Sequence, residues 1–140
     1  MSEQQASDPG HSLCRPRRAE PVSTPVGPYT PIVRAGDWLV VSGQLGLVDG
    51  KLVTGGLAAE MRQALTSLAA LLDGHGASLA DVVKTTVFLR HMSDYTPMND
   101  VYVTAFGGHR PARSAVGVAE LPLGALVEVE AWAHVPAGLR

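Results

Sequence analysis

The 140-residue sequence predicts an α+β fold, in which a mixed β-sheet carries two helices on one face. Segments rich in β-branched residues lie before, between and after two stretches whose apolar residues recur at helical spacing. Two helices that alternate with strands in this way pack most naturally together on one face of the sheet. A chain of this length forms one domain and buries enough surface to need no disulfide or metal for its core.

The first half of the chain predicts a group of short strands. A short strand is expected near residues 31–34, and the β-rich run 38–43 follows a Gly36-Asp37 turn pair. Asp49-Gly50 predicts a hairpin turn, from which residues 51–53 return as a third strand.

The hydrophobic period then changes from that of a strand to that of a helix. From Leu57 onward, one helical face is formed by Met61, Leu65, Leu68, Leu71 and Leu72. Gly74 and Gly76 are expected to end this helix as C-cap residues.

The second half predicts a strand, a helix and two further strands. Residues 82–89 are rich in β-branched side chains, which favours a strand. Ser93-Asp94 supply an N-cap for a second helix, which tolerates Pro97 in its first turn and ends at Gly107-Gly108. Strands are expected at residues 114–119 and 126–133, so the predicted order is β-β-β-α-β-α-β-β.

The last strand alternates cleanly between apolar and polar side chains. Val127, Val129, Ala131 and Ala133 face one way, toward the helices, whereas Glu128, Glu130 and Trp132 face the other. A solvated sheet face would explain the second set. A tryptophan prefers cover, however, and a helix-free face is a typical place for subunits to meet. Partial desolvation there raises the pKa of a carboxylate toward the range that suits a general base.

The composition narrows the classes of partner. A net charge of -2 gives no electrostatic footprint for nucleic acid. No apolar run approaches the ~20 residues of a membrane span, and no secretory signal is visible near the start, so we expect a cytoplasmic protein. Residues 1–22 are polar and rich in proline, which predicts a flexible tail before a single domain over residues 23–140.

Several enzyme signatures are absent. Cys14 is the only cysteine and lies in the expected tail, so it is not interpreted as a nucleophile. The five histidines lack metal-ligand spacing, and the glycine-rich stretches match neither a phosphate loop nor a dinucleotide fingerprint. We therefore expect no metal and no nucleotide cofactor.

Five sequence blocks, in order and with matching spacing, resemble the Rid (reactive intermediate deaminase, YjgF-type) family. They are Gly27-Pro28-Tyr29, Val41-Ser42-Gly43-Gln44, the run 83–89, the run 110–118, and Leu121-Pro122 through Ala131. The resemblance covers about residues 26–135. It implies a chorismate-mutase-like α+β fold and a homotrimer with sites in the clefts between neighbouring subunits. It also implies cofactor-independent hydrolysis of 2-aminoacrylate-like enamines, or their imine tautomers, to 2-keto acids and ammonia.

The resemblance assigns the catalytic roles to two residues. Arg113 is expected to anchor the substrate carboxylate, because its planar fork binds a carboxylate bidentately. The alternative is an ion pair with Glu128 or Glu130. Glu128 is expected to hold and activate the attacking water and to move protons to the leaving nitrogen. Glu130 lies on the same face, but the family's spacing from Arg113 selects Glu128.

Four further residues are expected to contact the substrate. Tyr29 offers a ring or hydroxyl, with a packed turn residue as the alternative. Ser42 lines the cleft, with a hydroxyl bonded to backbone as the alternative. Asn99 offers a polar contact from the second helix, with capping or surface solvation as alternatives. Backbone groups near Ala115 orient the imine nitrogen; many relatives carry cysteine there, which puts the substrate range in doubt more than the activity.

Two other functions stay open at this point. The same scaffold could serve a dedicated catabolic or biosynthetic pathway and act on a larger enamine acid. A non-catalytic trimer could instead bind small carboxylates or act as a chaperone, because an arginine anchor serves binding alone equally well.

Overall fold

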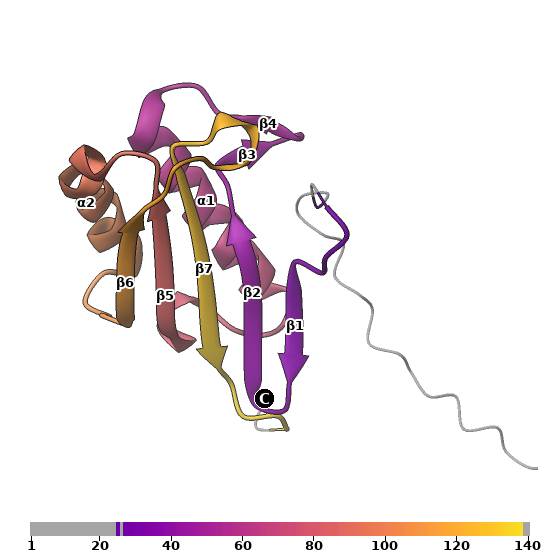
Figure 1. Ribbon diagram of the computed structural model, residues 1–140. Coiled ribbons are helices and arrows are strands. Elements are labelled where there is room, and N and C mark those ends of the chain that lie inside the picture. Colours follow the sequence, from indigo (N-terminus) through magenta and orange to yellow (C-terminus); the bar gives the residue numbers. More distant parts are fainter. Residues whose placement is uncertain (1–24, 26, 139–140) are drawn as a thin grey trace, which may run out of the picture.

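The computed structural model in Figure 1 describes residues 25 and 27–138. The expected tail over residues 1–22, including Cys14, lies outside the described residues. No helix in the described part of the chain is long and apolar enough to cross a membrane.

The main feature is a mixed sheet, as predicted, and it contains five strands. Its strand order is β1-β2-β7-β5-β6, and only the β5–β6 pair is parallel. In that order the strands span Ile32–Ala35, Trp38–Gln44, Val127–His134, Val82–Leu89 and Ala112–Gly117. The last strand of the chain is therefore the central strand of the sheet (Figure 1).

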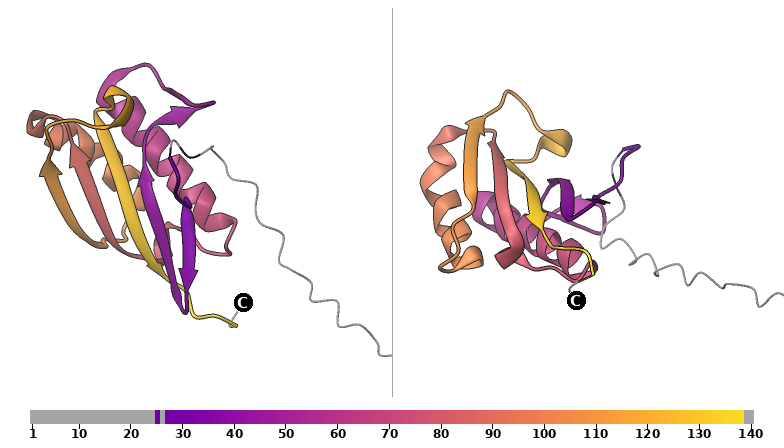
Figure 2. Two further views of the ribbon diagram at one scale, coloured as in Figure 1. Left: turned by 45° about the vertical axis from the view of Figure 1, so that its right-hand side comes forward. Right: turned by 90° about the horizontal axis from the view of Figure 1, so that it is seen from below.

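Both helices cover the same face of this sheet, which confirms the predicted layers (Figure 2). α1 (Gly56–Asp73) packs against β7 and β2. α2 (Tyr95–Phe106) packs beside α1 and lies over β5, where the Tyr102 hydroxyl is 2.8 Å from the Thr85 hydroxyl. The βαβ crossover β5-α2-β6 explains the parallel pair, because two parallel strands need a long connection.

The core is built from the alternation that the sequence shows in β7. Val127, Val129, Ala131 and Ala133 are fully buried toward the helices. Ala131 and Ala133 are small, which lets α1 lie close to the centre of the sheet. The predicted facing of this strand is confirmed.

The predicted hairpin turn is also confirmed, but it belongs to a separate two-stranded sheet. β3 (Leu47–Val48) and β4 (Lys51–Leu52) pair only with each other. Asp49 and Gly50 both have positive φ, at 51° and 76°, as a type I′ turn requires. The observed order therefore contains one strand more than predicted, because a two-residue strand is too short to show a pattern.

Some element ends differ from the prediction. β6 begins at Ala112 and ends at Gly117, earlier than the predicted 114–119, because its ladder with β5 extends from Lys84 to Leu89. Asp94 occupies the N-cap position of α2, but its side chain makes no capping hydrogen bond. The 3₁₀ turn Met92–Asp94 leads directly into the helix instead.

The expected C-cap geometry of α1 is only partly present. Gly74 is the C-cap residue, yet its φ of -61° is right-handed. The left-handed glycine comes two residues later, at Gly76, where φ is 72°.

Candidate functional site

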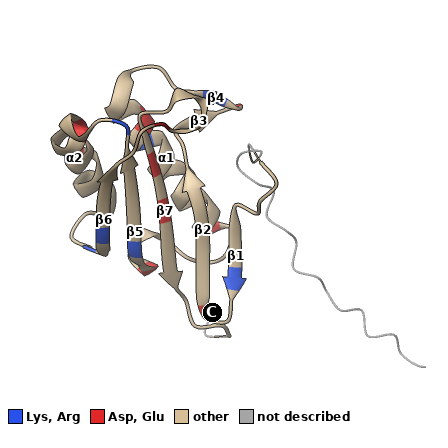
Figure 3. Ribbon diagram, in the orientation of Figure 1, with Lys and Arg blue, Asp and Glu red and all other residues tan. Residues whose placement is uncertain are grey.

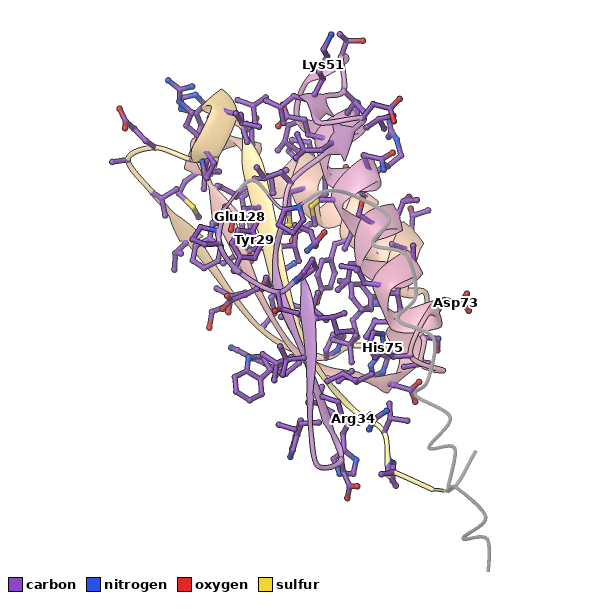
Figure 4. All side chains as sticks on the ribbon, turned by 90° about the vertical axis from the view of Figure 1, so that its right-hand side faces the viewer. Tyr29, Arg34, Lys51, Asp73, His75 and Glu128 are labelled. Atoms are coloured by element: carbon purple, nitrogen blue, oxygen red, sulfur yellow. The ribbon has the colours of Figure 1, made fainter. Side chains whose placement is uncertain are left out.

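A hollow of about 260 Å³ opens beside the upper half of β2 and β7. It brings together three of the predicted site residues, Tyr29, Ser42 and Glu128, which come from an N-terminal turn and two strands. Figure 4 shows Glu128 and Tyr29 next to each other at this place. The other lining residues are Pro25, Pro31, Gly43, Gln44, Leu45, Leu47 and Pro122.

Glu128 fits into this hollow because β2 is irregular opposite it. The register of β2 against β7 shifts between Val41 and Gln44, so the intervening residues Ser42 and Gly43 form a bulge. A Cβ atom on Gly43 would lie only 1.8 Å from Glu128 Oε1. The absence of a side chain at Gly43 is therefore what gives the carboxylate its space.

The surroundings of Glu128 favour its protonated form. Partial burial, and to a smaller degree the negative charge of Glu130, raises the pKa of Glu128 above its usual value. This is the direction expected for a partly desolvated carboxylate on the helix-free face of the sheet. A raised pKa brings a carboxyl group closer to the working range of a base at neutral pH.

Ser42 and Tyr29 are held by backbone contacts on the wall of the hollow. The Ser42 hydroxyl donates a 2.8 Å hydrogen bond to the Thr30 carbonyl. The side-chain amide of Gln44 donates one of 3.0 Å to the Ser42 carbonyl. Ser42 thus both lines the hollow and makes the backbone bond that was its alternative role. Tyr29 follows a tight turn, with its N–H bonded to the Gly27 carbonyl, and its side chain is 43% exposed.

Arg113 lies elsewhere, on the edge strand β6. Its guanidinium contacts α2: Nη2 donates to the Tyr95 hydroxyl at 3.2 Å, and Nη1 is 3.7 Å from the Met98 sulfur. The same group lies 4.7 Å from the centre of the Tyr102 ring. Arg113 therefore points to the helix side of the sheet.

Arg113 and Glu128 are consequently on opposite sides of one sheet. The residues flanking Glu128 are buried toward the helices, so Glu128 and Glu130 point to the helix-free face, here called the open face. Figure 3 shows the acidic positions of β7 separated by β5 from the basic position on β6. The alternative of an ion pair between Arg113 and Glu128 or Glu130 is wrong within one copy of the chain.

Asn99 lies in the interior of α2, one residue after Met98. Its Oδ1 atom is buried and has no hydrogen-bond partner. Asn99 does not cap the helix, because the N-cap position belongs to Asp94. The residue is partly exposed, so solvation of the rest of its side chain stays an alternative. Ala115 lies on β6, where it pairs with Val87 of β5 and packs partly against the core. Its side chain does not line the hollow.

Sequence reasoning missed Gly43 as a residue that shapes the site. A glycine inside a strand pattern signals a bulge or a close approach, and both are present at Gly43. Within residues 25 and 27–138, no group of three or more His, Cys, Asp or Glu side chains could hold a metal ion. The functional groups that line the hollow include the Glu128 carboxylate and the Ser42 and Tyr29 hydroxyls.

We expect Gly43→Ala to lower turnover about tenfold or more while the protein stays folded, since displacement of a reacting group by about 1 Å can cost 10²-fold. The new methyl group would displace the Glu128 carboxylate, which can rotate away at the end of a flexible side chain. Gly108→Ala is the control, because a Cβ atom there meets nothing within 4 Å. Normal turnover and an unchanged thermal midpoint in Gly43→Ala would contradict this view of the site.

The sequence and the structure of this chain are similar to those of known proteins. The family model described as endoribonuclease L-PSP matches residues 19–135. The 2-iminobutanoate/2-iminopropanoate deaminase of Mus musculus is 44% identical over 110 residues, covering 77% of this chain and 82% of its own. A RutC family protein of Pyrococcus horikoshii is 42% identical over 112 residues, covering 79% and 89%. The crystal structure of RidA from the Antarctic bacterium Psychrobacter sp. PAMC 21119 is 35% identical, with a TM-score of 0.77 over 84% of this chain and 100% of the other.

Proposed function

Because this chain belongs to the Rid (YjgF-type) family, as its sequence blocks suggested, we propose that it hydrolyses small 2-imino acids to 2-keto acids and ammonia. The proposed substrates include 2-iminobutanoate, 2-iminopropanoate and the enamines that tautomerise to them. The observation that carries the proposal is the confined carboxylate of Glu128, which shares a hollow with the Ser42 and Tyr29 side chains.

The proposed reaction needs a carboxylate anchor and one group that moves protons. The enamine first gains a proton at carbon and loses one from nitrogen, which gives the imine, whose carboxylate is bound by Arg113. Glu128 removes a proton from a water molecule as the water oxygen bonds to the imine carbon, and it passes this proton to the nitrogen, which gives a carbinolamine. Glu128 then takes the hydroxyl proton and gives it to the leaving nitrogen as the carbon–nitrogen bond breaks, which releases ammonia and the keto acid. Water is the only co-reactant, and we propose that no metal or organic cofactor takes part.

We propose further that each site forms between two copies of the chain in a homotrimer. Arg113 and Glu128 cannot meet across their own sheet, but Arg113 of one copy can approach the open face of another. That face exposes two tryptophans, Trp38 and Trp132, whose rings are 6.3 Å apart and 39% and 46% exposed. Exposed aromatic side chains of this kind are typical of an interface between subunits.

We also propose that nucleic acid is not a substrate, although the matching family model carries an endoribonuclease description. The net charge of -2 gives the protein no overall positive charge that would attract a polyanion such as RNA. A small anionic substrate needs only one cation, and Arg113 supplies it.

A trapping assay tests the reaction directly. An amino-acid oxidase generates 2-imino acids of several sizes, and semicarbazide traps those that survive. We expect the wild-type protein to suppress trapping and Arg113→Ala to leave it unchanged. Equal trapping of the imino acids with and without stoichiometric wild-type protein, at every substrate size, would contradict the proposal.

Mixing two inactive variants tests whether the site lies between copies. Arg113→Ala and Glu128→Gln subunits are unfolded together in equal amounts and refolded as mixed oligomers. In a cyclic oligomer, about one quarter of the sites then combine an intact Arg113 with an intact Glu128, since each has a probability of one half. We expect about that share of wild-type activity. No activity at all would indicate that each site takes both residues from the same copy, since every copy then lacks one of them.

Glu130→Gln should shift the pH dependence of the reaction. The base form of Glu128 is required, so the rate falls as the pH drops through its pKa. Glu130 contributes to raising that pKa, so its neutral replacement moves the acidic limb of the kcat profile to lower pH. A limb that stays in place or moves upward would show that Glu130 does not act on the base.

A further inference from the structure

The guanidinium of Arg113 is held by two tyrosines from α2. Tyr95 and Tyr102 are seven residues apart, which places them on one side of the helix with Met98 between them. The Arg113 guanidinium carbon lies 5.6 Å from the Tyr95 ring centre and 4.7 Å from that of Tyr102. Both distances lie within the range of a cation–π contact.

The two tyrosines differ in burial and in hydrogen bonding. Tyr102 is 4% exposed, and its hydroxyl is tied to Thr85 at 2.8 Å. Burial, only partly offset by that bond, raises its pKa and keeps it a neutral phenol. The Tyr102 ring is therefore a fixed surface against which the guanidinium packs.

Tyr95, by contrast, is 40% exposed at the first position of α2 and lies outside the buried core. Its hydroxyl accepts the 3.2 Å hydrogen bond from Arg113 Nη2. Since a long arginine side chain is otherwise free to rotate at a sheet edge, this bond selects the direction in which the remaining N–H groups point.

We propose that Tyr95 is a positioning residue for the carboxylate anchor. Its hydroxyl accepts a hydrogen bond from one N–H of Arg113. The rings of Tyr95 and Tyr102 fix the orientation of the guanidinium plane. The substrate carboxylate then meets a fork that is already oriented, which reduces the ordering cost of binding. This inference rests on the proposed function, in which Arg113 binds the substrate carboxylate.

Binding of a stable carboxylate provides the first test. The 2-keto acid product 2-oxobutanoate serves as the probe, and its Kd is measured by titration calorimetry on the intact oligomer. We expect Tyr95→Phe to raise Kd by about 3–10-fold. A fully buried charged hydrogen bond would change Kd more, but this bond is exposed to solvent. Thr96→Val is the matched control: it removes a neighbouring exposed hydroxyl and should leave Kd unchanged.

Kinetics separate positioning from a general structural effect. The lost interaction acts on substrate and transition state alike, so Tyr95→Phe should raise KM by the same factor and leave kcat within about twofold. A loosened fold would instead lower the thermal midpoint of unfolding and kcat together. That second pattern would overturn the proposal.

A double-mutant cycle links Tyr95 to Arg113. In an Arg113→Lys background, Tyr95→Phe should have no further effect on Kd, because lysine cannot present the same fork. If Arg113→Lys weakens binding while Tyr95→Phe binds as tightly as wild type, the role of Tyr95 is wrong and the proposed function stands. If both Arg113→Lys and Arg113→Ala bind and turn over normally, Arg113 is not the carboxylate anchor, and the role of Tyr95 is wrong with it. Absence of turnover by the wild-type protein in the trapping assay would instead overturn the proposed function.

Discussion

Glu128→Gln is expected to lower kcat by about 10²–10⁴-fold, the usual cost of losing a positioned base. Glutamine has the shape of glutamate and fits the space left by Gly43, but its amide cannot take a proton from water. Binding of 2-oxobutanoate should be kept within a few-fold, because the carboxylate anchor is Arg113. Steady-state turnover in the trapping assay and calorimetric titration measure the two effects separately.

The same substitution should make the protein more stable at neutral pH. The pKa of Glu128 is raised in the folded state, chiefly by burial, so folding favours the protonated form. A raised folded-state pKa contributes stability that is present below the ordinary pKa and lost as the pH rises through the folded value. The ionised carboxylate at neutral pH is therefore a cost, which a neutral amide removes, and the urea midpoint should increase.

Glu130→Gln is the control for this experiment, since it alters the adjacent carboxylate on the same face of β7. Its kcat at neutral pH should remain close to that of wild type. Turnover that survives in Glu128→Gln but is lost in Glu130→Gln would show that the other carboxylate is the base. Loss of 2-oxobutanoate binding in Glu128→Gln would indicate a role in binding instead of proton transfer.

Gly46→Ala is expected to lower the free energy of unfolding by about 1–3 kcal/mol, as overpacking of a tight contact does. A Cβ atom on Gly46 would lie 2.6 Å from both the Cα and the carbonyl oxygen of Glu60. These are backbone atoms of α1, which cannot rotate away as a side chain can. Relief of the contact requires α1 to move away from the β2–β3 connection.

This movement should also reach the site. The buried Glu60 carboxylate accepts a 2.9 Å hydrogen bond from the Leu126 N–H, two residues before Glu128. Displacement of α1 would loosen that bond, so we expect kcat to fall along with stability. Urea unfolding with Gly108→Ala as the control measures the first effect; wild-type stability in Gly46→Ala would show that α1 is not closely packed there.

Much of the fold could be predicted because local patterns report burial directly. The helical spacing of leucines in α1 and the alternation in β7 both follow from which side chains avoid water, and both match the structure. Element ends were less predictable. The start of β6 depends on its ladder with β5, and α2 begins from a 3₁₀ turn without side-chain capping.

Some residues of the site could likewise be predicted from the sequence, and others could not. The types of residue that bear the proposed chemistry, Arg113 and Glu128, could be chosen from sequence blocks and from the face that Glu128 occupies. Gly43 could not, because its importance depends on a carboxylate that is 85 residues away in the chain and 1.8 Å from its missing Cβ atom. Neither the Tyr95 contact nor the buried oxygen of Asn99 has a local sequence signal.

The sequence by itself determined the α+β class, the two helical faces and the inward and outward sides of β7, because each depends on near neighbours in the chain. Only the tertiary structure decided that β7 is the central strand, because pairing between distant segments sets strand order. That central position places Glu128 against the bulge of β2. Alternation along β7 turns Glu128 to the helix-free face, whereas Arg113, which the β5-α2-β6 crossover carries to the edge of the sheet, points to the helix side. Separation of the two residues by the sheet is the physical reason to look for the complete site between two copies of the chain.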